Sequence, residues 1–220
     1  MSNNRVIRLR GRDVTITDEM RGQVLEEMPE IGWIKDEGLR TNVLDAWGAA
    51  LSASNMARIG DMKPSGNYDS LPMRHGTQAD HIRSVTRMAV KIAEEMNDLF
   101  PDFSYDRDLL IAGSLCHDIG KVWEFDPDNV ERWQAAPRAV GKPSMRHPGF
   151  GLHICLTAGL PEAVAHMAAA HSGEGELLVR SLENTILHWA DYTFWMVVEA
   201  GGQLSQRNDR APPQKPTRPS

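Results

Sequence analysis

The chain has 220 residues, of which 41% are hydrophobic, and its 24 basic and 30 acidic residues give a formal net charge of −6. This length is enough for one sizeable core and marginal for two. The negative charge argues against a nucleic acid polymer or an anionic membrane as partner, and no apolar run approaches the roughly 18 residues that a membrane span needs. Since the N-terminus is polar, without a secretory signal, we expect a cytoplasmic protein. We divide it into a lead-in (residues 1–70), a main domain (71–200) and a disordered tail (201–220).

The lead-in is expected to contain one helix, over about residues 36–58. Apolar residues recur there every four positions, at Leu39, Val43, Trp47 and Leu51. We interpret this helix as packing for the core, with a lid over a site as the alternative. Residues 63–68 are rich in turn formers and would connect it to the main domain. No two-residue alternation in the chain is long enough to predict a sheet, so the expected fold class is all-α.

The main domain begins with two predicted helices. An apolar stripe with steps of three and four predicts the first over about residues 77–99, with His81 in its first turn. The second is expected over residues 106–120, with an aspartate as N-cap and a glycine at its end. His117 and Asp118 would then lie in its last turn, where side chains can face a cleft.

Residues 122–143 contain three prolines and little periodicity, which predicts a long loop of functional significance. Pro148 predicts the start of a helix that Gly159 ends, and Pro161 predicts the start of another that runs to about His171. A last long helix is marked by an apolar stripe at Leu178, Leu182, Ile186 and Trp189. Asp191 would lie on a neighbouring face of that helix. The tail carries four prolines among polar residues and is expected to be disordered.

The most informative residues are four histidines and two aspartates: His81, His117, Asp118, His147, His171 and Asp191. Imidazoles and carboxylates suit iron, manganese and zinc, and a carboxylate can bridge two ions with its two oxygens. The doublet His117-Asp118 can therefore supply a terminal ligand and a bridge. Taken alone, each histidine would more often be an ordinary surface or core residue. The other four histidines, and Cys116 as a small buried residue, have no place in this pattern.

The order of these residues resembles the HD-domain superfamily of metal-dependent phosphohydrolases. The resemblance is carried by Asp80-His81, by His117-Asp118 with the following Ile119-Gly120-Lys121, and by Asp191, and it covers roughly residues 75–200. His147 and His171 fall where binuclear members place the ligands of a second metal. The resemblance therefore implies a helical bundle that binds two divalent ions, with iron or manganese favoured and zinc, cobalt or magnesium as alternatives.

Two reactions are compatible with this resemblance. The first is hydrolysis of a small phosphorylated metabolite, with Asp118 and Lys121 in catalytic roles and Lys121 and Arg146 near the phosphate charge. The second is the chemistry of the mixed-valent di-iron oxygenases of the superfamily, which cleave a carbon-carbon or carbon-phosphorus bond. A noncatalytic metal-binding regulatory module is a third reading. The absence of a Gly-Tyr-Pro signature argues against the cyclic-dinucleotide phosphodiesterases. We favour the hydrolase with a small anionic substrate, and leave a homo-oligomer open.

Overall fold

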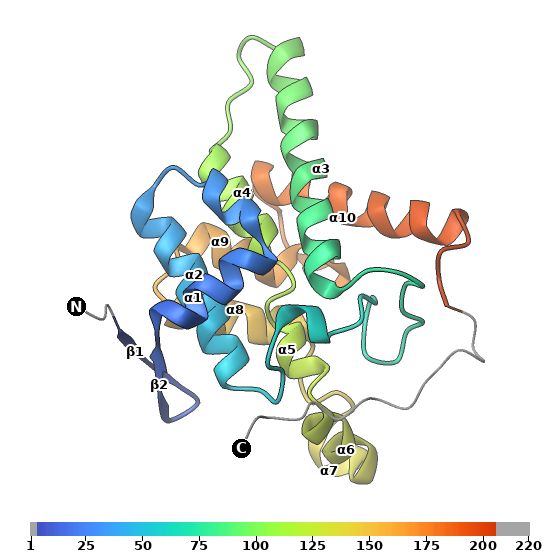
Figure 1. Cartoon of the computed structure of the whole chain (residues 1–220). Coiled ribbons are helices and arrows are strands. Elements are labelled where there is room, and N and C mark those ends of the chain that lie inside the picture. Colours follow the sequence, from blue (N-terminus) through green and yellow to red (C-terminus); the bar gives the residue numbers. More distant parts are fainter. Residues whose placement is uncertain (1–3, 206–220) are drawn as a thin grey trace.

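The structure is a computed structural model that describes residues 4–205. This part of the chain is mostly helical, which confirms the all-α class (Figure 1). In the main domain the helices are α3 (Gln78–Leu99), α4 (Arg107–Cys116), α5 (Lys121–Glu124), α6 (Pro127–Ala135), α7 (Pro137–Val140), α8 (His147–Thr157), α9 (Glu162–Ala170), the 3-10 helix η3 (Gly173–Leu177) and α10 (Leu182–Ala200). Between residues 4 and 205, no helix has both the length and the apolar character that crossing a bilayer requires.

The lead-in contains more secondary structure than predicted. It contains an antiparallel hairpin of β1 (Arg5–Leu9) and β2 (Arg12–Ile16), and then α1 (Asp18–Glu27), η1 (Pro29–Trp33), α2 (Glu37–Ser52) and η2 (Ile59–Asp61). The expectation of no sheet and of a single helix is therefore wrong. Each strand has only five residues, so the alternation is too short to stand out in the sequence. The predicted helix is α2, which Asp36 caps and which ends at Ser52, before Arg58.

One hydrophobic core joins the lead-in to the main domain. Ile16 and Trp47 of the lead-in are fully buried in the same cluster as Leu115 and Phe150 of the main domain. The Trp47 indole also donates a hydrogen bond of 3.1 Å to the backbone oxygen of Leu115, the residue two before His117. Helix α2 is thus part of the core that supports α4.

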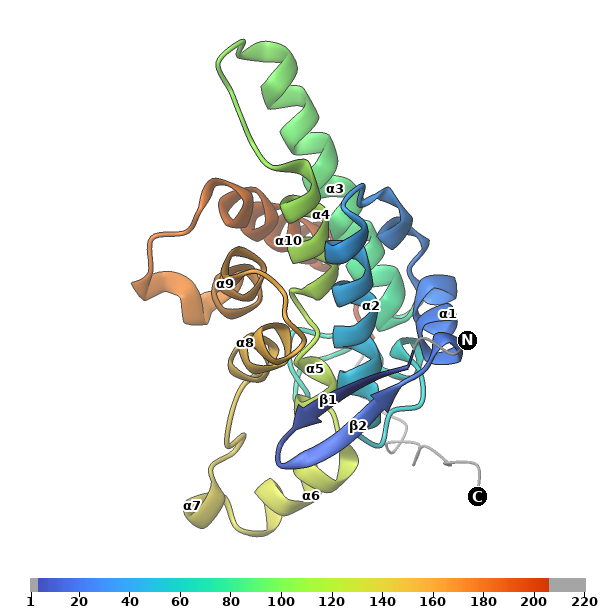
Figure 2. The ribbon, with the colours of Figure 1, turned by 90° about the vertical axis from the view of Figure 1, so that its left-hand side faces the viewer.

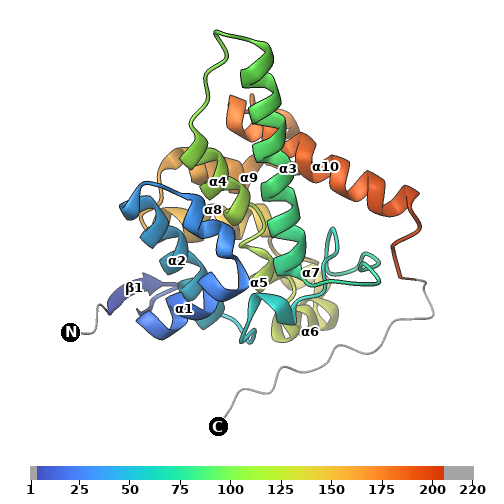
Figure 3. The same cartoon turned by 45° about the horizontal axis from the view of Figure 1, so that its top comes forward.

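A second, smaller cluster joins α3, α4, α9 and α10, and α10 crosses α3 (Figure 3). Helix α3 extends over the range expected from its stripe, with Thr77 as N-cap. In α10, however, the buried face differs from the predicted stripe. Leu182 and Trp189 are exposed and Leu178 precedes the helix, whereas the face with Ile186, Leu187, Ala190 and Asp191 is buried. Between Glu183 and Glu199 the exposed positions of α10 carry no charged residue, so apolar residues alone do not identify its inner face.

The expected loop over residues 122–143 is wrong, because the chain forms three short helices there (Figure 2). Pro127 and Pro137 each occupy an early position of a helix, where a missing N–H costs nothing. Asp126 caps α6 by accepting hydrogen bonds from the next backbone N–H groups, and Trp133 anchors α6 in the core. The two prolines therefore begin helices, whereas from the sequence alone they are interpreted as marks of a loop.

The boundaries of α8 and α9 agree with the predictions from Pro148, Gly159 and Pro161. Gly159 has a φ of 80°, as expected for a residue that ends a helix. Residues 206–220, most of the predicted disordered tail, lie outside the described residues. Within the first part of that tail, Leu204 forms a β-bridge with Met73.

Candidate metal centre

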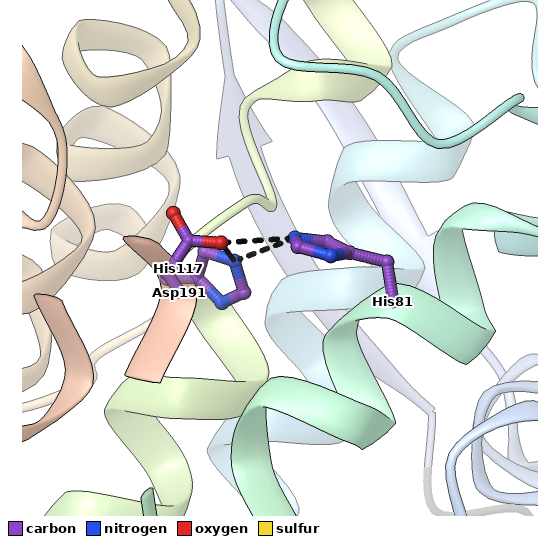
Figure 4. Close-up of side chains that lie close together, drawn as sticks. All are labelled: His81, His117 and Asp191. Carbon is purple, nitrogen blue, oxygen red and sulfur yellow. Dashed lines mark hydrogen bonds and ion pairs between the residues drawn. The ribbon is translucent and has the colours of Figure 1, made fainter. Parts of the chain in front are cut away.

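The first group of candidate ligands comes from α3, from the residue after α4 and from α10. His81 lies on the first turn of α3, which begins with a capping box in which Thr77 and Asp80 bond reciprocally to each other's backbone N–H. His117 directly follows α4, and Asp191 lies in the middle of α10. The ring nitrogen Nε2 of His81 is 3.4 Å from Nε2 of His117 and 3.3 Å from Oδ1 of Asp191 (Figure 4). These three buried residues could hold one metal ion.

Asp118 joins this group to a second one. Its Oδ2 atom is 3.2 Å from Nε2 of both His81 and His117. Its Oδ1 atom is 3.4 Å from Nε2 of His147 and 3.7 Å from Nε2 of His171. The two last imidazoles face each other, with 3.4 Å between their Nε2 atoms. We call the ligands on the Oδ2 side the first half-site and those on the Oδ1 side the second half-site.

Three of the four imidazoles are oriented by acceptors behind them. Nδ1 of His117 is 2.6 Å from the backbone oxygen of Ser114, and Nδ1 of His171 is 3.1 Å from that of Ala168. Nδ1 of His147 is 2.7 Å from a carboxylate oxygen of the buried Glu124. An imidazole whose Nδ1–H donates to such an acceptor presents a bare Nε2 on its other side when it is neutral. The three bare Nε2 atoms then point to Asp118.

A glycine brings the two half-sites together. A Cβ atom added at Gly120 would collide with the backbone of His147 and Gly151 in α8. Gly120 has ordinary backbone angles and begins the short helix α5, so it does not end α4 as predicted; α4 ends at Cys116. Its role is to let α8 approach the turn that carries Asp118.

Burial and neighbouring charges together set the pKa values of the residues in the centre. Burial alone would raise the pKa of Asp118, but the neighbouring Lys121 and His117 hold it well below its ordinary value. Burial likewise disfavours a charged Asp191, yet the hydrogen bond and charge of His81 lower the pKa of Asp191 to about 2. Burial lowers the pKa of His147 despite its bond to Glu124. For His81, burial is outweighed by hydrogen bonds to both aspartates, and the pKa is raised. The site therefore keeps two carboxylates ionised, as metal ligands must be.

The two basic residues predicted near the substrate have different surroundings. Nζ of Lys121 is buried, 2.8 Å from Oδ2 of Asp118 and 2.6 Å from the backbone oxygen of Ser65. Arg146 is half-buried and donates to Glu124 and Glu174, at 2.9 Å each. Arg146 thus holds the carboxylate that orients His147, and its contact with substrate stays a prediction.

Sequence reasoning missed three residues that surround the ligands. Gln78 donates a 2.7 Å hydrogen bond to Oδ2 of Asp118, Glu124 orients His147, and Nδ1 of His188 is 2.6 Å from the backbone oxygen of His171. Gln78 precedes His81 by three residues, and Glu124 follows Lys121 by three, which on a helix places each pair on one face. This spacing could have identified Gln78 and Glu124 as neighbours of the site residues. Cys116 is buried as expected, and a hydrogen bond with Cys155 together with burial raises the pKa of its thiol.

The donor set fits divalent metal. Each half-site brings imidazole nitrogens and an oxygen of Asp118 together, and the first half-site adds Asp191. In the second half-site, two bare Nε2 atoms at 3.4 Å cannot bond to each other without a proton, whereas one cation can satisfy both. Nitrogen and carboxylate ligands of this kind suit iron, manganese or zinc. All six predicted ligands thus meet in one place.

The comparisons with known proteins agree with this geometry. The sequence model of a family described as HD domain matches residues 79–196, more than half of the chain and a range that includes all six ligands. Neither the search of curated proteins nor that of solved structures found a match. With its helical bundle and its buried His-Asp cluster, the chain belongs to the HD domain family.

Proposed function

We propose that the protein is a metal-dependent hydrolase that cleaves a small phosphorylated compound at a binuclear centre. The observation that carries the proposal is the position of Asp118, which directs Oδ2 to His81 and His117 and Oδ1 to His147 and His171. A carboxylate placed in this way can hold two ions side by side. Two-metal sites are common in enzymes that displace a group at phosphorus.

The chain's own residues divide the work as follows. His81, His117, Asp118 and Asp191 would hold one ion, and Asp118, His147 and His171 would hold the other. We expect iron or manganese, with zinc, cobalt and magnesium as alternatives. When bound, the two ions supply Lewis acidity toward a phosphoester and lower the pKa of water. Glu124, Ser114 and Ala168 keep the imidazoles oriented throughout.

Lys121 is proposed as the residue that offsets phosphate charge. An ammonium group has three N–H donors, and two of them are engaged, by Asp118 and by Ser65. Among the described residues no third acceptor contacts Nζ, so one donor is left for an oxygen of the substrate. Arg146 is proposed to make a weaker contribution to offsetting the phosphate charge, since Glu124 and Glu174 already neutralise much of its own positive charge.

The burial of the ligands supports a small substrate. The six residues range from fully buried to 7% exposed for Asp191, so only a compact group can reach the ions. A polymer would also meet a protein of net charge −6. We therefore propose a small phosphorylated metabolite as the substrate, without a nucleic acid polymer or a membrane as partner.

The test is a screen of phosphoesters with the protein loaded with ferrous iron, manganese, cobalt, zinc or magnesium under strict anaerobiosis. We expect phosphate release that is abolished in His117→Ala, because a ligand is lost. Lys121→Ala should mainly weaken substrate binding or transition-state stabilisation. His153→Ala is the matched control, since His153 is an exposed histidine outside the centre and its loss should leave turnover unchanged.

An oxygen electrode charged with candidate phosphonates and polyols completes the experiment. Oxygen uptake coupled to substrate loss, with no phosphate release when oxygen is absent, would contradict the hydrolase. It would favour the di-iron oxygenase chemistry that the same ligands allow.

A further inference from the structure

Two arginines on one face of the hairpin have very different surroundings. Arg5 and Arg12 both share the face of the buried Leu9, since residues two apart on a strand, or directly opposite across the pair, point the same way. The Arg5 guanidinium bonds to Asn42, Asp45 and the backbone oxygen of Ala158 at 2.7–2.9 Å. Arg12 makes no hydrogen bond or ion pair with any residue between 4 and 205. Arg12 is exposed, so its N–H donors are open to a ligand from solvent.

The turn of the hairpin holds another arginine in an unfavourable backbone conformation. Arg10 has a φ of 53° and Gly11 one of 76°. A tight turn with positive φ at both central residues strongly favours asparagine, aspartate or glycine, because a β-carbon is strained there. The Arg10 guanidinium lies over the indole of Trp123, 4.0 Å from the ring centroid. The strained position thus directs this side chain to α5.

Both arginines line a cavity of about 310 Å³ between the hairpin, the end of α2 and the α5–α6 segment. Figure 2 shows the turn of the hairpin next to α5 and α6. Trp123, Asn55 and Asn129 also line it. Arg132, on α6, is near enough to act on Arg10: burial, then repulsion from Arg12 and Arg132, lowers the pKa of Arg10 despite attraction from Asp126. Two exposed arginines thus line this cavity with Arg132 nearby, and its lining also includes Asp126 and Asp128.

The carboxylates of the cavity do not form ion pairs with these arginines. Asp126 accepts hydrogen bonds from the backbone N–H groups of Asn55, Asp128 and Asn129 and from the Asn55 amide. Asp128 accepts another bond from that amide. A basic groove near Trp33 is different, because its Arg87 and Lys91 pair with Glu30 and Glu94. The hairpin cavity is thus the better candidate for an added anion.

We propose that the cavity lined by Arg10, Arg12 and Trp123 binds a small phosphorylated anion, at a site separate from the metal centre. A guanidinium matches phosphate oxygens with two parallel N–H donors, and Arg12 is free to offer them. The volume of the cavity suits a phosphate monoester of modest size. This site does not depend on the reaction at the metal centre.

The experiment is calorimetric titration of the full-length, metal-loaded protein with inorganic phosphate. The double variant Arg10→Asn/Arg12→Gln removes both guanidiniums, and asparagine tolerates the left-handed conformation of residue 10, so the hairpin should be retained. We expect its affinity for phosphate at this site to fall at least tenfold. Arg8→Gln is the matched control, because Arg8 is an exposed arginine of the same hairpin that pairs with Asp13. It should bind phosphate like the parent protein.

A third variant, His117→Ala, separates the two sites. Phosphate binding that persists in His117→Ala and disappears in the double variant supports the proposal, whatever the metal centre does. Phosphate binding that disappears in His117→Ala and is unchanged in the double variant overturns it and leaves the proposed hydrolase intact. Absence of any phosphate binding by a folded parent protein, checked by its melting curve, also overturns it.

Discussion

Both carboxylate oxygens of Asp118 are committed, one to each half-site. His171, in contrast, serves the second half-site through its single Nε2 atom. We therefore predict that Asp118→Ala loses most of both ions, whereas His171→Ala loses mainly one. Elemental analysis of the purified variants against about two ions per parent chain is the measurement. Retention of the metal by Asp118→Ala would show that the centre is not built around this carboxylate.

Glu124 tests whether the residue behind a ligand controls metal affinity. Its carboxylate accepts hydrogen bonds of 2.7 Å from both the backbone N–H and Nδ1 of His147. Partners of this kind typically contribute 10–100-fold in metal affinity. We expect Glu124→Gln to lower the affinity of the second half-site for its metal ion by about this factor. Competition with a metal-binding dye is the measurement. Glu174→Gln is the control, since Glu174 bonds to Arg146 without contacting His147; an equal loss there would point to Arg146 instead.

The convergence of the six candidate ligands was predictable because residue type, order and spacing all report their chemistry. The supporting residues were harder to find. Gln78 and Glu124 are common polar residues whose role depends on which atom they meet across the fold, at 2.7 Å from Asp118 and from His147. Ser114 and Ala168 act through backbone oxygens, which no side-chain pattern reports.

Among the elements, the approach of α8 to the turn after α4 depends on Gly120. A methyl group at this position would meet the backbone of His147 and Gly151, which cannot rotate away. We predict that Gly120→Ala destabilises the fold by about 2 kcal/mol or more and lowers occupancy of the second half-site before the first. Urea unfolding and metal analysis check this.

The control for this substitution is Gly22→Ala. Gly22 lies within α1, and a Cβ atom added there meets nothing within 4 Å. Alanine is the better helix former, so stability should be unchanged or slightly higher. If both glycine variants had the same stability as the parent, the close contact of α8 would not be a constraint.

The elements that were predicted well are helices with clear ends, such as α3 with its capping box and α9 after Pro161. Among those that were missed, α1 buries only Val24 along its ten residues, and α6 begins at a proline that was expected to belong to a loop. The hairpin strands and α5 have five and four residues, too few for a period to be recognised. In α10 the exposed face carries Trp189 and Met196, so hydrophobicity alone could not assign the buried side.

For the whole molecule, the candidate ligands come from helices that are distant in sequence, so metal binding should stabilise the native state. A ligand at 100 times its Kd adds about 2.7 kcal/mol, which corresponds to roughly 5–10 °C in Tm for a chain of this size. We predict that thorough chelation lowers the Tm by this order and that metal addition restores it. Asp118→Ala should show little response to the chelator. An unchanged melting curve for the parent protein would mean that the cluster holds no metal.

The two half-sites also differ in the sequence separation between the residues that they bring together. His147 and His171 are 24 residues apart and lie at the start of α8 and just after α9, helices that pack against each other. His81 and Asp191 are separated by 191 − 81 = 110 residues, across nearly the whole main domain. By loop-closure entropy the longer connection costs about 1.4 kcal/mol more. We therefore expect the α8–α9 pair to assemble early during folding, and the site near His81 to be complete only when α10 docks as the closing element.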